Sequence, residues 1–164
     1  GWGPSVYEIL NNAFPEFPEN VLLLPADAKV NTYDLVEAAD LGMVFTTTVG
    51  MEMALIGKPV IVTGNTHYRG KGFTVEPTGW EDYFAKLQEI LGDPASYLLN
   101  EEKVDLVWRY AFRFFFEYPQ PFPWHVQKFW ERQKKWSIEQ VLSPEGLANF
   151  GKTFNYLTGE KIIW

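Results

Sequence analysis

The residue types best suited to chemistry gather between residues 39 and 74, where an apolar run ends in three threonines. A glycine and a glutamate follow them, at the start of a predicted helix. The free N–H groups of a first helical turn, together with threonine hydroxyls, form a site for an anion. The glycine lets a ligand approach the backbone closely, and the carboxylate can accept hydrogen bonds from two neighbouring ribose hydroxyls. The candidate residues are Thr46, Thr47, Thr48, Gly50 and Glu52.

An ordinary helix cap explains the same spacing. Threonine is a favoured N-cap residue, and an acid in the following turn completes a common capping arrangement. The pair Thr48 and Glu52 fits that description, so spacing alone does not separate a cap from a ligand site.

A second polar loop follows the next apolar run and contains His67, Arg69 and Lys71. The two cations can neutralise a phosphate or a sugar carboxylate, and the histidine can act as a general acid or contact a phosphate. A solvated surface loop would have the same composition. Asp27 and Asn31, after the first apolar run, are weaker candidates for contact with a base or ribose, because both are normal turn residues.

Apolar periodicity predicts that these loops belong to an α/β domain. Short apolar runs indicate buried parallel strands, and apolar residues at helical spacing indicate helices between them. Such alternation predicts a parallel sheet with right-handed crossovers, whose ligands bind where strand carboxyl ends meet helix N-termini. The predicted elements are helix 4–14, strand 21–24, a helix capped by Asn31 or Thr32, strand 42–45, helix 50–56 and strand 59–62.

Residues after 77 are predicted to be mainly helical, over 80–91, 96–117, 124–136 and 143–157, with a Pro-rich turn at 118–123 as the best internal boundary. We expect one domain, with a nucleotide-binding core at 1–77 and a helical completion at 78–164. The aromatic block 108–136 is interpreted mainly as core, although aromatic faces also bind sugar rings.

Composition narrows the classes of function. The formal charge of −7 argues against a nucleic-acid-binding surface, which needs a cationic face. The absence of cysteine excludes disulfides and thiolate metal sites, and two distant histidines offer little for a metal. No apolar run reaches the roughly 18 residues of a membrane span. The chain starts without Met or a signal peptide, so we expect it to be a piece of a longer protein.

The motifs between residues 20 and 77 resemble the capsule polysaccharide biosynthesis family, which groups with GT-B glycosyltransferases. That family has a small-hydroxyl pair, a G-x-E turn, a helix and G-K-P-V, then G-x-x-x-Y and G-x-T. The family usually has Ser at the first hydroxyl position, where this chain has Thr, and its upstream His-Pro motif does not occur here. The matching segments are Thr46 to Thr48, Val49 to Glu52, Gly57 to Val60, Gly64 to Tyr68 and Gly72 to Thr74, with Asp34-Leu35 and Ala39-Asp40 as the lead-in.

The resemblance implies the donor-binding C-terminal domain of a Rossmann-like, three-layer GT-B protein that uses a nucleotide sugar, with a CMP-linked sugar acid as the typical donor. It implies that Glu52 holds the ribose and that the loop from Thr46 to Gly50 faces the phosphate. Tyr68 and Thr74 become further site candidates. Transfer would serve surface or capsular polysaccharide synthesis in the cytoplasm or at the inner face of the membrane, as a peripheral protein. No cofactor or metal is expected.

The acceptor-binding domain and its general base should lie upstream, so this piece alone is expected to bind the donor without transferring the sugar to a glycan acceptor. Two other interpretations stay open. One is a sugar-nucleotide epimerase or glycerophosphate transferase on the same fold, because both use a similar Glu and phosphate loop. The other is a non-enzymatic interaction module with a vestigial phosphate loop. Fold alone does not choose among these.

Overall fold

The computed structural model describes residues 3–14, 16–124 and 129–161, except for the side chains of residues 129 and 133. Its internal contacts divide the chain into two compact units, Gly1–Leu99 (unit 1) and Asn100–Trp164 (unit 2). The division falls before the Pro-rich turn that the sequence suggested as a boundary. The description as one domain, with a core at 1–77 and a helical completion at 78–164, stays a prediction.

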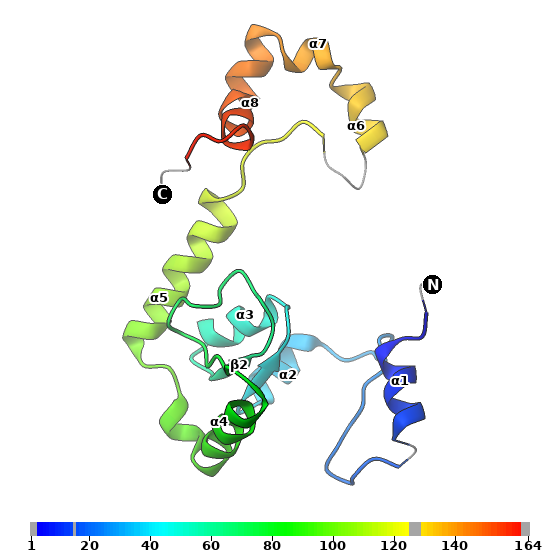
Figure 1. The fold of residues 1–164 in the computed structure, drawn as a ribbon, viewed down its shortest axis with the longest axis vertical. Helices are drawn as coiled ribbons and strands as arrows, with labels where there is room; N and C mark the ends of the chain where they lie inside the picture. The colour runs from blue at the N-terminus through cyan, green and yellow to red at the C-terminus, as the bar shows by residue number, and fades with distance from the viewer. Residues whose placement is uncertain (1–2, 15, 125–128, 162–164) are drawn as a thin grey trace. The chain divides into compact units, whose positions relative to one another are not determined.

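Unit 1 mixes helices with two short strands, which confirms the mixed α/β class (Figure 1). Local signals explain where two of its helices begin. A reciprocal capping box between Ser5 and Glu8 starts the first helix, and the side chain of Asn31 accepts from Tyr33 N at the start of the second. The elements are α1 (Val6–Ala13), α2 (Thr32–Ala38), β1 (Gly42–Val44), α3 (Val49–Leu55), β2 (Val60–Val62), α4 (Trp80–Gly92) and the 3₁₀ turn η1 (Pro94–Tyr97).

The two strands pair in parallel, as predicted, with Gly42 opposite Val60. All three residues of β2 are buried, and such a continuous apolar run is typical of a parallel strand covered on both faces. Val75 lies along the other edge of β2, where its N–H donates to Val60 O at 2.8 Å and its carbonyl accepts from Val62 N at 2.9 Å. The sheet thus continues by one bridge beyond the two strands.

Alternation of side chains along β1 positions the two helices that cover it. A Cβ atom added at Gly42 would lie 2.5 Å from Met53 Sδ of α3, so this position faces that helix. The next residue, Met43, points to the opposite face, where its Sδ accepts a hydrogen bond from Tyr83 of α4 at 3.3 Å. Helices α3 and α4 therefore pack on opposite faces of β1 (Figure 1).

The lysine of the G-K-P-V motif ties α2 to the segment before β2. Lys58 Nζ donates to Glu37 O and Ala39 O, at 2.5 Å each. Both carbonyls lie at the C-terminal end of α2, where a cation also complements the helix dipole. The motif therefore has a structural use, independent of any ligand.

The predicted strand at 21–24 is wrong. These residues form no strand, and Leu22 is 82% exposed. The N–H of Val21 closes a turn onto Pro18 O, so the backbone bends at the point where a strand would begin. An apolar run becomes a strand only when a neighbouring strand accepts its hydrogen bonds, and β1 pairs with β2 in the part of the chain that is described.

Unit 2 is helical, and its first helix begins later than predicted. Asn100 accepts a hydrogen bond from Lys103 N and caps the first helix, so residues 96–100 are excluded from it. Trp124 lies before the described start of α6, and residues 125–128 of the predicted helix lie outside the described part. The elements are α5 (Glu101–Phe112), the π-helical turn η2 (Arg113–Glu117), α6 (Phe129–Lys135), α7 (Ile138–Val141) and α8 (Pro144–Leu157).

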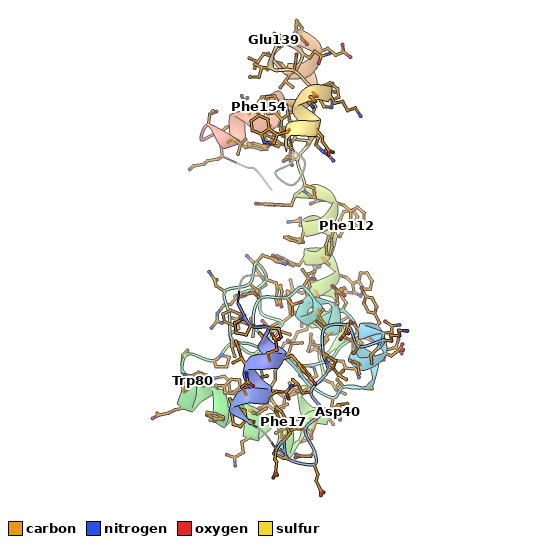
Figure 2. The ribbon with its side chains drawn as sticks, turned by 90° about the vertical axis from the view of Figure 1, so that its right-hand side faces the viewer. Phe17, Asp40, Trp80, Phe112, Glu139 and Phe154 are labelled. Atoms are coloured by element: carbon orange, nitrogen blue, oxygen red, sulfur yellow. The ribbon has the colours of Figure 1, made fainter. Side chains whose placement is uncertain are left out.

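The aromatic block is only partly core, which corrects the prediction for its first half. Val107 and Ala111 are buried, whereas Phe112 (Figure 2) is 55% exposed. Phe112 stacks at 5.3 Å on Phe116, which is 75% exposed. Near the end of the block, Trp136 packs edge-on against a buried phenylalanine of α8.

Over the described ranges, no helix is both long enough and apolar enough to cross a membrane.

Candidate functional site

The turn after β1 orients the carboxylate of Glu52. Thr48 occupies the N-cap position of α3, but its side chain does not accept from the helix backbone. Its hydroxyl instead donates to Glu52 Oε1 at 3.1 Å, and Thr47 Oγ1 accepts from Val49 N at 3.3 Å. The simple capping interpretation is therefore incomplete, because the Thr48 hydroxyl holds the acid.

Helix α2 contributes a residue that the sequence analysis missed. The pKa of Tyr33 is raised because its side chain hydrogen-bonds to Glu52 and because the negative charge of that carboxylate opposes ionisation. Tyr33 is 61% exposed, so the cluster of Tyr33, Thr48 and Glu52 opens to solvent. The groups of this cluster can accept hydrogen bonds from vicinal hydroxyls and can donate hydrogen bonds to them. Tyr33 lies two residues after the N-cap signal at Asn31, and no spacing rule links it to Glu52.

Tyr68 joins the two predicted loops. Its hydroxyl donates to Thr47 O at 2.6 Å, and its side chain is fully buried. Burial raises the pKa of Tyr68, an effect that the side chain of Thr66 opposes. A Cβ atom at Gly50 would lie 2.5 Å from this hydroxyl and 2.8 Å from Val44 Cγ2. The glycine is therefore required by packing under the turn, whatever ligand the turn binds.

Arg69 holds two segments of backbone together, the end of β2 and the stretch before α4. Its Nη1 donates to Val62 O at 3.0 Å and Gly64 O at 3.1 Å, and its Nη2 donates to Pro77 O at 3.0 Å. Three of the five guanidinium N–H groups are used in this way. Its predicted contact with a phosphate stays a prediction, and it would depend on the remaining N–H groups.

Glu76 closes the rest of the loop. Its Oε1 accepts from Gly70 N at 2.6 Å and from Thr74 Oγ1 at 2.9 Å, and its Oε2 lies 4.0 Å from Arg69 Nε. Gly70 and Gly72 have φ of 76° and 89°, values that glycine adopts without strain. Thr74, a weaker candidate from the motif, therefore contributes to the shape of the loop.

The other cationic candidates of this loop lie at its surface. His67 packs edge-on against Tyr68, with ring centroids 5.0 Å apart, and loss of hydration lowers the pKa of the imidazole below its ordinary value. At neutral pH the imidazole is therefore mainly uncharged, a form suited to a base more than to an acid. Lys71 is exposed.

The two weakest candidates have local structural roles. Asn31 caps α2, and its Nδ2 also donates to Asp34 Oδ1 at 3.2 Å. Asp27 is exposed in a turn closed by the N–H of Ala28 donating to Pro25 O.

An open cleft of about 690 Å³ lies beside the turn after β1. Most of its lining could not be predicted from the sequence, because those residues come from the loop after β1, the long connection between β2 and α4, and α4 itself. The available signal is the position of Phe45 at the end of one predicted strand and of Thr63 directly after the next. The cleft is lined by Phe45, Thr63, Gly64, Asn65, Arg69, Pro77, Thr78, Gly79, Trp80 and Tyr83.

The first turn of α4 forms one wall of this cleft. Asp82 accepts hydrogen bonds from Thr78 N at 2.8 Å and Thr78 Oγ1 at 3.1 Å, and from Lys86. The Lys86 hydrogen bond, followed by that of the Thr78 backbone, lowers the pKa of Asp82 to about 2. The carboxylate is therefore ionised at neutral pH and keeps the Thr78 hydroxyl in the donor role.

Comparison of the chain with models of protein families, with curated proteins and with solved structures gives no match.

Proposed function

We propose that unit 1 is the donor-binding domain of a GT-B-like glycosyltransferase and that it binds a nucleotide sugar at the carboxyl edge of β1 and β2. The observation that carries the proposal is the hydrogen bond from Tyr68 Oη to Thr47 O, at 2.6 Å. This bond joins the two loops that follow the parallel strands, in the place where ligands bind in sheets of this kind.

The ribose and the phosphate of the donor each have a matching group in the proposal. The Glu52 carboxylate, oriented by Thr48, accepts hydrogen bonds from the two ribose hydroxyls. The turn at residues 46–50 faces the phosphate, and stabilisation of the leaving phosphate there would assist transfer. The three-layer, Rossmann-like arrangement is part of this proposal, and the parallel β1–α3–β2 unit with helices on both faces of β1 supports it.

Calorimetric titration of the chain with CMP, UDP and GDP tests the proposal. We expect one nucleotide to bind, and we expect Glu52→Gln to weaken that binding about 10-fold to 100-fold, because charge-assisted hydrogen bonds to the ribose are lost. Glu145→Gln is a matched control, because Glu145 also lies in the first turn of a helix, but in unit 2. Equal affinity in the wild type and Glu52→Gln would remove the ribose role.

The exposed aromatic residues of unit 2 favour a second candidate, a non-enzymatic interaction module. Phe112 and Phe116 present more than half of their surface to solvent, and exposed apolar patches often mark sites of protein interaction. This candidate predicts that none of the three nucleotides binds and that the chain associates through the region after residue 97. Sedimentation of the chain beside Phe116→Ser would detect that association.

A further inference from the structure

The cleft beside the turn after β1 combines aromatic faces with hydrogen-bonding groups. Phe45 is 70% exposed and Trp80 is 77% exposed, and both line the cleft with Tyr83. Trp80 (Figure 2) begins α4. Its ring packs edge-on against Tyr83 at 6.0 Å and stacks on Phe84 at 6.2 Å. Flat aromatic faces that remain open to solvent in a concave site are suited to covering one apolar face of a ring.

The two threonine hydroxyls of the cleft are placed to accept hydrogen bonds from a ligand. The Thr63 hydroxyl lies 3.2 Å from the Val44 carbonyl, and the Thr78 hydroxyl lies 3.1 Å from the Asp82 carboxylate. Both neighbours are acceptors, so both hydroxyls give their hydrogen to the protein and offer lone pairs to a ligand. The Asn65 side chain is exposed at the same site and offers both a donor and an acceptor.

This combination selects among ligand classes. An anion needs donors, which the two threonines do not supply, and three of the five N–H groups of Arg69 are used by backbone carbonyls. The carbonyl groups of a pyrimidine base also need donors. A pyranose ring presents an apolar C–H face to an aromatic side chain and a rim of hydroxyl groups that can donate to threonine oxygens. A volume of about 690 Å³ lies within the usual range of about 300–1,000 Å³ for small-molecule sites.

The walls of the cleft are fixed to one another before any ligand arrives. Arg69 binds the carbonyls of Val62, Gly64 and Pro77, which belong to the segments on two sides of the cleft. A Cβ atom at Gly64 would lie 2.2 Å from Phe45 O, so the ends of the two strands are in close contact. A site with fixed walls loses little conformational freedom on binding.

We infer that this cleft is a carbohydrate subsite, in which Phe45 and Trp80 cover the apolar face of a pyranose ring and Asn65, Thr63 and Thr78 bind its hydroxyls. The inference rests on the proposed function to the extent that the ring is the sugar of the nucleotide donor. Phe45 directly precedes the turn proposed to face the phosphate, so a sugar in the cleft would be adjacent to that phosphate.

The test compares a nucleotide sugar with its parent nucleotide, using UDP-glucose, UDP-N-acetylglucosamine and CMP-sialic acid against UDP and CMP in calorimetry. We expect one sugar conjugate to bind more tightly than its nucleotide. Trp80→Ala should remove that advantage, with a loss on the order of five-fold to ten-fold, and leave the affinity for the nucleotide unchanged. Asn65→Ala should act in the same direction. Trp108→Ala, an exposed tryptophan of α5, is the control.

Other outcomes overturn the inference. If Trp80→Ala weakens nucleotide and conjugate equally, the ring stacks on the base; if it changes neither, the cleft is not the subsite. If no nucleotide binds, the proposed function fails, and saturation-transfer NMR with methyl glycosides of glucose, N-acetylglucosamine and sialic acid tests the cleft separately. A signal that Trp80→Ala removes would support the subsite, and no signal from any of the three sugars would overturn it.

Discussion

Gly64→Ala is expected to destabilise unit 1 by about 3 kcal/mol, the upper part of the range for overpacking. The added Cβ would lie 2.2 Å from Phe45 O and 2.8 Å from Phe45 C, which are backbone atoms and have no alternative rotamer. Relief would require the ends of β1 and β2 to separate, and the hydrogen bond from Thr63 N to Val44 O at 3.0 Å would be strained.

The measurement for Gly64→Ala is urea unfolding, with amide exchange at Val62 and Val75 as the site-resolved readout. Gly92→Ala is the matched control, because a Cβ atom there meets nothing within 4 Å and the residue ends α4. Alanine in a helix should leave stability unchanged or raise it by up to about 1 kcal/mol. Equal stability of the two variants would show that the strand ends are not held as closely as described.

Arg69→Met is expected to cost about 2–3 kcal/mol. Methionine keeps part of the apolar volume but leaves the carbonyls of Val62, Gly64 and Pro77 without their charged donor. Each lost charge-assisted bond would cost about 1.5–3 kcal/mol if the carbonyl stayed dry, and partial access of water to this 28% exposed side chain reduces the sum. Arg69→Lys should lose nearly as much, because one ammonium group does not reproduce the planar fork.

The comparison of Arg69 with Lys71 separates a structural role from phosphate binding. Lys71→Met removes a charge from an exposed side chain of the same loop, and we expect stability to change by less than about 0.5 kcal/mol. Urea unfolding gives the stability of each variant, and calorimetry gives its nucleotide affinity. If Arg69→Lys kept full stability and lost nucleotide affinity, the structural role assigned to Arg69 would be wrong.

Periodicity predicted the elements that local signals specify. The parallel strands predicted at 42–45 and 59–62, the helix between them and the helix cap at Asn31 follow from apolar runs and capping residues, and the structure confirms them. The run at 21–24 has the same local appearance as a strand, but a strand also needs a partner, which the run itself does not encode. Asn100 was an available cap signal, and it explains why α5 begins five residues after the predicted start.

The contacts at the candidate site could not be predicted from spacing. Tyr68 is the clearest example, because its hydroxyl reaches Thr47 O across 21 residues. Motif matching placed Tyr68 among the ligand candidates, whereas its position in the fold is buried under the turn. Trp80 is the opposite case, because the sequence indicated only the start of a helix. Its exposed position beside Phe45 depends on how β1 and α4 pack together.

Hydrogen–deuterium exchange with CMP, UDP and GDP added in turn tests the central claim most directly, because it locates binding without a choice of mutation. The account predicts that one nucleotide slows exchange in peptides covering residues 44–53 and 62–78, the two loops that Tyr68 joins, and leaves residues 101–117 unchanged. Protection confined to unit 2, or no protection with any of the three nucleotides, would contradict a nucleotide site at the carboxyl edge of β1 and β2.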